Sequence, residues 1–296
     1  EMSSRGLGDV YKRQPHLEKA LEYNPNSSSV VNMLSNLYAN YIPNTSKYLT
    51  YALKGIQLEV DANDSITQSY IYLNLSNALI QNGFVDGAEK FIDKSLDYNP
   101  NNYFAPYVKA FVLYARNKDI EQTKLLLLNE LQKDTNRLDI LQEVAKLYYY
   151  QESYDTAFHY YQKFVEARQA NKVDIYAHED IKIGILYEKK GLKNEAAKFF
   201  ESYANYCEQD ESIYKPLSTA ALFTYQGKLD EAIEQLEIFS TKSNYQYWIL
   251  LFMESDPVFK PLQKHPEFKA VMQKIETKFW DNHNELKETL NAKGLL

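Results

Sequence analysis

Apolar residues recur along the chain with the period of an α-helix, in paired segments that short polar turns separate. The stretch 183–200 shows the pattern most clearly. One amphipathic segment runs to Lys190, a turn contains Gly191, and a second amphipathic segment starts at Lys193. The pattern predicts two antiparallel helices joined by a tight turn.

Each of these two segments combines a small residue with an aromatic residue one helical turn later. Gly184 comes three residues before Tyr187, and Ala196 comes four residues before Phe200. Two helices approach closely only where one side chain at the crossing is very small, and a ring one turn away fills the space beside it. The spacing therefore predicts a closely packed helix–turn–helix unit.

The same unit recurs on both sides of this stretch. Its expected small and large structural positions are Ala88 in an earlier pair, Ala145, Tyr148 and Ala157 in the preceding pair, and Ala220 and Ala232 in the following pair. Helices are expected at 27–41, 45–58, 65–81 and 85–98. The unit at 103–134 is the weakest, because its second helix contains four consecutive leucines and lacks the usual alanine.

A small residue, two others and Tyr, then Ala, three others and Phe, at a period of about 34 residues, resembles the tetratricopeptide repeat family. The resemblance covers residues 15–244 and implies an all-α fold. That fold is a right-handed α-solenoid of antiparallel helix pairs, with six to seven repeats of which the first is truncated. Residues 245–296 depart from the pattern and are expected to form a degenerate repeat and C-terminal capping helices, which solenoids need.

Both ends of the chain carry further resemblances. The string Asp256-Pro257-x4-Leu262-x3-Pro266-x-Phe268 is similar to the segment that ends repeat arrays in some bacterial signalling proteins, including transcription regulators and nucleotide cyclases. Residues 1–14 contain GLGDVYKRQ, which resembles translated sequencing-adapter sequence. We therefore set residues 1–14 aside as non-native, and expect the natural protein to continue upstream of a C-terminal fragment.

Charge and composition exclude several classes of partner. The net charge of −7 gives no basic surface for nucleic acid. No apolar run approaches the length of a membrane span. The single cysteine, Cys207, excludes a disulfide framework and any multi-cysteine metal site. One free cysteine suits the cytoplasm, which is the expected compartment.

Motifs for catalysis are absent from the sequence. It contains no phosphate-binding loop, dinucleotide fingerprint, zinc-protease motif or nucleophile elbow. The cluster His178-Glu179-Asp180 has ligand-like chemistry, but successive helical residues point about 100° apart and chelate one ion poorly. We therefore expect no catalytic residue, no cofactor, no metal and no enzymatic activity.

The 26 tyrosines include a set that does not fit the core stripe. By register, the exposed side of each first helix is expected to line a peptide-binding groove with Tyr70, Asn74, Asn77, Phe104, Tyr107, Phe111, Tyr149, Tyr150, Tyr214 and Tyr225. Aromatic side chains offer a large contact area at low entropic cost. The competing interpretation is that neighbouring helices pack over these rings. A carboxylate-binding clamp is disfavoured, because Leu73 stands where a lysine is needed.

The leading hypothesis is a non-enzymatic scaffold that binds a protein, a peptide, or an upstream domain of its own chain through this aromatic groove. The alternative is the regulatory tail of a bacterial transcription regulator or nucleotide cyclase. A third hypothesis, sugar binding by the tyrosine-rich groove, rests on composition alone.

Overall fold

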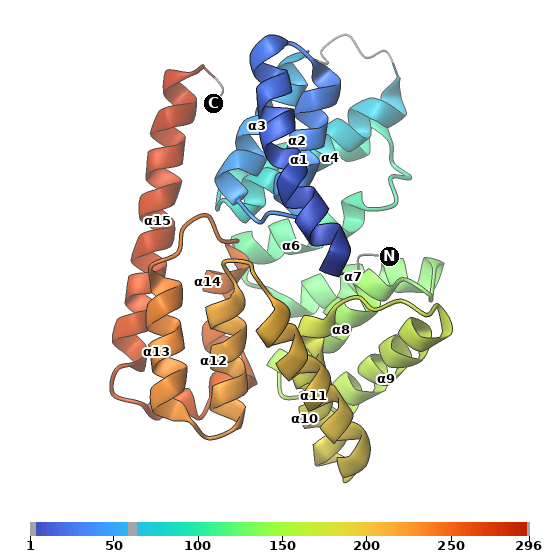
Figure 1. Cartoon of the computed structure of the whole chain (residues 1–296). Coiled ribbons are helices and arrows are strands. Elements are labelled where there is room, and N and C mark those ends of the chain that lie inside the picture. The colour runs from blue at the N-terminus through green and yellow to red at the C-terminus, as the bar shows by residue number, and fades with distance from the viewer. Residues whose placement is uncertain (1–3, 59–63, 295–296) are drawn as a thin grey trace. The chain divides into compact units, whose positions relative to one another are not determined.

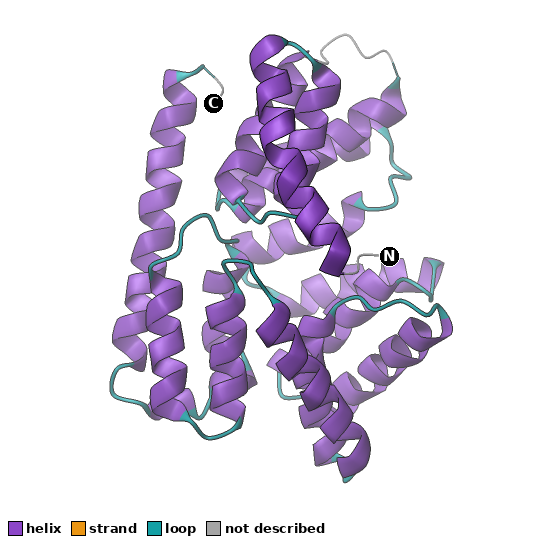
Figure 2. Ribbon diagram, in the orientation of Figure 1, coloured by secondary structure: helices purple, strands orange, loops and turns teal. Residues whose placement is uncertain are grey.

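The computed structural model describes residues 4–58 and 64–294, with side chains from residue 12 onward. Over these ranges the chain forms fifteen α-helices and four short 3-10 helices and contains no strand (Figure 2). The predicted all-α fold of helical pairs is confirmed. No helix in the described part of the chain is long and apolar enough to cross a membrane.

The chain divides into two compact units. Unit 1 comprises the residues up to Arg116, Ser243–Ile249 and the residues from Thr277 onward. Unit 2 comprises Asn117–Lys242 and Leu250–Glu276. The C-terminal region therefore contributes segments to both units.

Unit 1 holds the first helical pairs (Figure 1). Its helices are α1 (Ser4–Tyr23), α2 (Ser28–Asn40), α3 (Thr45–Leu58), α4 (Ser65–Gln81), α5 (Val85–Tyr98) and α6 (Ala105–Asn117, of which the last residue belongs to unit 2). Helices α2 and α3 pack as one pair and α4 and α5 as the next, with α3 against α4. The bounds of α3, α4 and α5 are those predicted.

Unit 2 continues the series of packed helical pairs with α8 against α9, α10 against α11, and α12 against α13. Its helices are α7 (Ile120–Lys133), α8 (Leu138–Tyr150), α9 (Tyr154–Ala170), α10 (Asp180–Lys189), α11 (Lys193–Gln209), α12 (Lys215–Tyr225) and α13 (Leu229–Ser240). A 3-10 turn, η1 (Ala177–Glu179), leads into α10.

The C-terminal region breaks the repeat. It contains α14 (Trp248–Phe252), three 3-10 helices named η2 (Met253–Ser255), η3 (Pro257–Phe259) and η4 (Leu262–Lys264), and the long helix α15 (Phe268–Ala292). The first part of α15 belongs to unit 2 and the part from Thr277 to unit 1. Asp256 accepts a hydrogen bond from the backbone N–H of Val258, as the predicted N-cap of this segment.

Turns within the helical pairs use left-handed backbone conformations. Gly83, Gly191 and Gly227 have φ values of +80°, +78° and +75°. At the corresponding turns Lys118 and Glu152 adopt φ values of 59° and 57° although they carry side chains. This conformation lets the chain reverse and satisfies the last carbonyl groups of the first helix.

The small residues of the repeat lie at the helix crossings. Ala88, Ala145, Ala157, Ala220 and Ala232 are completely buried. Tyr148 stacks on Tyr160 with parallel rings 5.6 Å apart, and Tyr187 is buried between Phe158 and Phe199. These positions build the core on which the surface residues are placed.

From Ser4 onward, the segment set aside in the sequence has helical backbone. Helix α1 begins at Ser4 and continues through Pro15 without a break. The side chain of Gln14 donates a hydrogen bond to Tyr38 Oη at 3.0 Å. The non-native origin of residues 1–14 stays a prediction.

Candidate functional site

The predicted groove residues are divided between the two units. Tyr70, Asn74, Asn77, Phe104, Tyr107 and Phe111 belong to unit 1, whereas Tyr149, Tyr150, Tyr214 and Tyr225 belong to unit 2. Their environments differ enough that the set does not form one uniform surface.

Two of the unit 1 candidates lie in an exposed apolar surface. The side chains of Ile66, Tyr70, Tyr103 and Phe104 are 55%, 41%, 44% and 46% exposed. Ile66 and Tyr70 are four residues apart on α4 and share one face. The rings of Tyr103 and Phe104 meet edge to face at 5.0 Å. We call these four residues the aromatic patch.

Sequence reasoning missed Ile66 and Tyr103. The spacing of Ile66 four residues before Tyr70 is a signal that would have found it. Tyr103 lies in the connection before α6, where helical register gives no direction for a side chain. Its partner in the ring contact, Phe104, was predicted.

A buried hydrogen-bond network fixes the two halves of the patch. Asn102 donates from Nδ2 to Ser69 Oγ at 2.8 Å, and Ser69 Oγ in turn donates to the carbonyl oxygen of Ser95 at 2.7 Å. Asn102 Oδ1 accepts from the backbone N–H groups of Phe104 and Ala105, which starts α6. The network holds the residues before α6 directly beside α4. Buried and satisfied polar groups of this kind specify one arrangement.

The two predicted asparagines bind a residue of the chain itself. Tyr48 is buried and donates from Oη to Asn74 Oδ1 at 2.7 Å. Asn77 donates from Nδ2 to Tyr48 Oη at 3.3 Å, and Asn74 Nδ2 donates to Ser35 Oγ. Both amides therefore help to join α3 to α4.

Of the remaining unit 1 candidates, Tyr107 is half-buried and Phe111 is covered by the C-terminal region. The expectation that Phe111 is exposed is wrong, since its side chain is only 5% exposed. Its ring lies 5.4 Å from the ring of Trp248 in an edge contact and 5.3 Å from that of Tyr107. A segment more than a hundred residues later in the sequence thus covers this part of the predicted groove.

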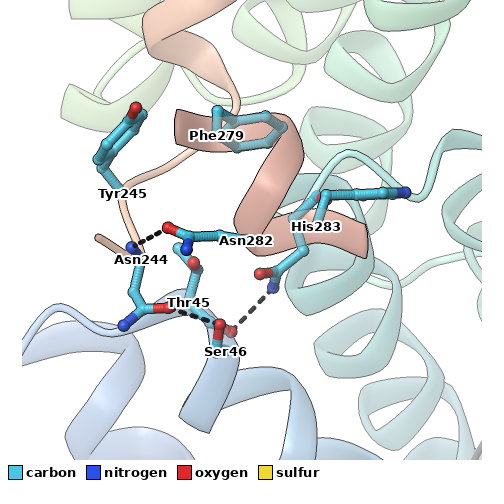
Figure 3. A pocket seen from close by; sticks show the side chains of 8 residues that line it. Thr45, Ser46, Asn244, Tyr245, Phe279, Asn282 and His283 are labelled. Atoms are coloured by element: carbon cyan, nitrogen blue, oxygen red, sulfur yellow. Dashed lines mark hydrogen bonds between the residues drawn. The ribbon is translucent and has the colours of Figure 1, made fainter. Parts of the chain in front are cut away.

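The same segment is joined to α3 and α15 by a polar seam, shown in Figure 3. Ser46 Oγ donates to Asn244 Oδ1 at 2.6 Å, and the backbone N–H of Asn244 donates to Asn282 Oδ1 at 3.4 Å. The backbone N–H of Thr45 donates to the carbonyl oxygen of Asn244. Three elements from distant parts of the sequence meet here.

On its other side, the polar seam contacts the turn between α4 and α5. Asn82 donates from Nδ2 to the carbonyl oxygen of Thr45, and its own carbonyl oxygen lies 2.7 Å from His283 Nδ1. The His283 ring also stacks on Phe84 with centroids 4.1 Å apart. The pocket between these residues has room for about one water molecule, too little for an organic ligand.

In unit 2, Tyr149 is buried, and its neighbour Tyr150 lies against the C-terminal region. The expectation of an exposed Tyr149 is wrong, because its side chain is 1% exposed. Tyr150 is half-buried and stacks on Phe252 with ring centroids 5.3 Å apart. Burial, followed by the negative charge of Asp256, raises the pKa of both tyrosines well above the usual value.

Tyr214 and Tyr225 pack between neighbouring helices and are half-buried. The Tyr225 ring stacks on Phe200 at 4.2 Å, and its hydroxyl donates to Glu188 Oε2 at 3.1 Å. Tyr214 lies 6.3 Å from the ring of Phe239. For these two positions the structure agrees with the competing interpretation of inter-helix packing.

The cluster His178-Glu179-Asp180 is built into a charge network. Glu179 is buried and accepts a hydrogen bond from Tyr161, and its Oε1 lies 3.5 Å from Lys182 Nζ. Burial opposes its ionisation, but Lys182 and Lys146 outweigh this effect and hold the pKa of Glu179 well below its usual range.

Asp180 has a separate set of partners. It pairs with Arg168 at 2.9 Å and accepts from Ser202 Oγ at 2.6 Å. Burial raises the pKa of Asp180 despite this arginine. Across the described ranges, no group of three His, Cys, Asp or Glu side chains is placed to hold a metal ion.

Comparison with known families and structures agrees with this architecture. Residues 69–102, which span most of α4, α5 and the following turn, match the model of the tetratricopeptide repeat family. The match supports the resemblance predicted from the sequence. A comparison with curated proteins found no relative by sequence.

Several solved helical-repeat structures are similar to the chain. The human IFIT1 dimer with PPP-AAAA is 15% identical, with 95% of this chain and 69% of that chain covered and a TM-score of 0.50. MamA is 15% identical over 59% of this chain and 88% of that chain, with a TM-score of 0.39. YrrB, described as a TPR protein with an unusual peptide-binding site, is 15% identical over 63% and 89%, with a TM-score of 0.37. At this level of identity the IFIT1 likeness shows the fold alone.

Proposed function

We propose that this chain is a non-enzymatic protein-interaction module that binds a partner peptide at the aromatic patch. The observation that carries the proposal is the exposure of Ile66, Tyr70, Tyr103 and Phe104 within one unit. Large apolar side chains left in solvent in a group mark interaction sites more often than single exposed residues do. The tetratricopeptide match over residues 69–102 contains Tyr70 and most of α4, and it supports the proposal.

The chemistry of the patch selects the kind of partner. Aromatic rings bind apolar anchors with a large contact area and bind cations over their faces. The net charge of −7 favours basic residues around those anchors, because complementary charge raises the association rate. The proposed ligand is therefore a peptide with apolar or aromatic anchors and flanking Lys or Arg.

Peptide selection tests this proposal. Peptides selected from a random library on the intact chain should lose about thirtyfold in affinity for a Tyr70→Ala/Phe104→Ala variant, as hot-spot truncations do. Tyr98→Ala is the matched control, since Tyr98 is 40% exposed and lies on α5 of the same unit. Selected peptides that bind the double variant and the intact chain equally would exclude the patch.

The C-terminal segment supports a second candidate function, the regulatory part of a bacterial transcription regulator or nucleotide cyclase. The supporting observation is the string from Asp256 to Phe268, in which Asp256 caps η3 as an N-cap residue. In that case the partner is an upstream domain of the same protein. The gene sequence upstream of codon 15 tests this candidate: an in-frame DNA-binding or cyclase domain supports it, and a reading frame without one excludes it.

The proposed compartment is the cytoplasm. The support is that the single cysteine, Cys207, is free, since free thiols without a disulfide framework are usual in a reducing compartment. Fractionation of cells that express the native gene tests the compartment directly.

A further inference from the structure

The residues from Phe252 to Leu262 form a strap within unit 2 that differs from the helical repeats. Pro257 and Pro261 interrupt helix formation, so the strap consists of the short turns η2 and η3 and the residues around them. Its apolar side chains Met253, Val258 and Phe259 are nevertheless buried. The strap thus combines an irregular backbone with buried apolar anchors, as a bound peptide does.

One end of the strap is anchored by an aromatic contact. Phe252 stacks on Tyr150 of α8, with an angle of 21° between the ring planes. At the other end, Lys260 Nζ lies 2.6 Å from Oε1 of Glu152, which follows α8. Between these two contacts η3 packs against α12. The strap therefore contacts the first helices of two repeats.

The centre of the strap is a buried carboxylate. Asp256 is 8% exposed, and its Oδ1 accepts the N–H of Val258 at 3.0 Å. Burial raises the pKa of Asp256, and the positive charges of Lys182 and Lys146 counteract this rise. A buried ion pair contributes little net stability, since desolvation offsets the attraction, but an unpaired buried charge is strongly unfavourable. The charges of Lys182 and Lys146 therefore favour an acidic residue at this position of any segment that occupies the site.

We propose that the strap is an internal ligand of unit 2, and that a partner segment with the same chemistry exchanges with it. That chemistry is an aromatic residue, an acidic residue four positions later, a proline, and a second aromatic residue three positions after the acid, as in Phe252, Asp256, Pro257 and Phe259. The site lies in unit 2, so it is independent of the aromatic patch in unit 1.

Because the strap is part of the same chain as its site, it competes with any external peptide and lowers the apparent affinity of that peptide. An external peptide binds only when the strap has left, so its apparent affinity is reduced by the fraction of molecules with an open site. Weakening the strap raises that fraction without changing α8 or α10. Peptide binding should therefore strengthen when the strap is damaged, which is the opposite of what damage to an ordinary core segment does.

Fluorescence anisotropy with a labelled peptide of residues 250–264 tests the exchange. The full chain with Phe252→Ala/Asp256→Asn should bind this peptide about tenfold more tightly than the unchanged chain does. Ile238→Ala, an exposed change on α13 of the same unit, should leave binding unchanged. A peptide with lysine in place of Asp256 should bind neither chain. A double variant with an intact circular dichroism spectrum and no gain in affinity would overturn the proposal.

Hydrogen exchange on the unchanged chain covers the case in which the double variant does not fold. The backbone N–H groups of Val258 and Phe259 donate to Asp256 within the strap, and both residues are buried. Their exchange should therefore accelerate when the strap leaves its site and these short turns enter solvent. They should exchange about a hundredfold faster than the amides in the middle of α8 and α10, through an opening that leaves these helices protected. Equal protection of strap and helices would show that the strap is core and would overturn the proposal.

Discussion

Gly184 on α10 lies directly against the ring of Phe200 on α11. A β-carbon added at Gly184 would come within 2.7 Å of Cε1 and 2.9 Å of Cδ1 of that ring. Contacts this short are not tolerated, so one of the two helices or the ring would have to move. The helical pair therefore depends on the absence of a side chain at this position.

Gly184→Ala should lower the free energy of unfolding by about 1–3 kcal/mol, the usual cost of overpacking. Urea denaturation followed by circular dichroism measures the loss. Adding Phe200→Leu should recover part of it, because the smaller side chain makes room for the methyl group. If the losses from Gly184→Ala and Phe200→Leu simply add in the double variant, contact with the Phe200 ring is not the cause of the destabilisation.

Gly55→Ala on α3 is the matched control for this change. The nearest atom to its added carbon is the side-chain oxygen of the exposed Asn32 at 3.3 Å, a longer contact than those at Gly184. Alanine is the better helix former, so we expect a change between zero and a gain of about 1 kcal/mol. A loss as large as that at Gly184 would mean that backbone effects dominate both variants.

Gly83→Ala should cost more than the same change at Gly191. Both residues have φ near +80°, so both variants carry the penalty of about 1–2 kcal/mol for an L-residue in this region. At Gly83 the added carbon would also lie 3.1 Å from Cε1 of Phe279 on α15, whereas nothing lies within 4 Å at Gly191. We expect the loss in free energy of unfolding, measured by thermal denaturation, to be about 1 kcal/mol larger for Gly83→Ala than for Gly191→Ala. Equal losses would show that α15 does not pack tightly on the α4–α5 turn.

Lys172→Gly should stabilise the chain by about 0.5–1 kcal/mol, since glycine adopts the left-handed conformation without strain. Lys172 has a φ of 52° and is exposed after the end of α9. Its N–H donates to the carbonyl oxygen of Gln169 at 3.1 Å, as in a helix-ending turn. The same substitution at the exposed Lys198, inside α11, should cost about 1 kcal/mol. The midpoint temperature of thermal unfolding should therefore rise for Lys172→Gly and fall for Lys198→Gly.

The helical pairs could be predicted from the sequence because their signals are local. Gly184 and Phe200 lie 16 residues apart in one hairpin, and the glycines at 83, 191 and 227 mark the turns directly. The environments of Tyr149 and Phe111 could not be predicted in the same way. Trp248 lies over Phe111, and Phe252 lies over Tyr150, the neighbour of Tyr149. No helical period relates Trp248 and Phe252 to the residues that they cover.

Tyr70 remains a candidate for the opposite reason. Its side chain on α4 is 41% exposed, so the position given by helical register is also its final position. Phe104 is 46% exposed as well, although it precedes α6 and has no helical register of its own. Ile66 could have been found from its spacing on α4. Tyr103 could not, because a connecting segment has no fixed period.

Glu179→Gln should destabilise the chain at neutral pH and much less in acid. The pKa of Glu179 in the folded chain lies well below the usual 4.5, so its charge stabilises the fold above pH 4.5. This contribution is lost as the pH falls through the folded pKa. At pH 7 the variant should lose about 3 kcal/mol, because it leaves the charge of Lys182 without its carboxylate. Urea denaturation at pH 7 and pH 3 measures both values.

Glu201→Gln, an exposed change on α11, serves as the control and should alter stability by less than about 0.5 kcal/mol at either pH. Asp180 and Asp256 have raised pKa values, so their protonation favours the folded state and acts in the opposite direction. The difference between Glu179→Gln and the unchanged chain isolates the single carboxylate. A loss of the same size at pH 3 and pH 7 would contradict its charged role.

The polar seam of unit 1 has a consequence for synthesis of the chain. Ser46 and Asn244 are 198 residues apart, and Asn82 and His283 are 201 residues apart. At roughly 5–20 residues per second, a ribosome takes about 10–40 s to make the intervening chain. During that time α3 and the α4–α5 turn have emerged without the residues that cover them. The nascent N-terminal repeats therefore present an open edge, a natural place for a chaperone to act before the last helix arrives.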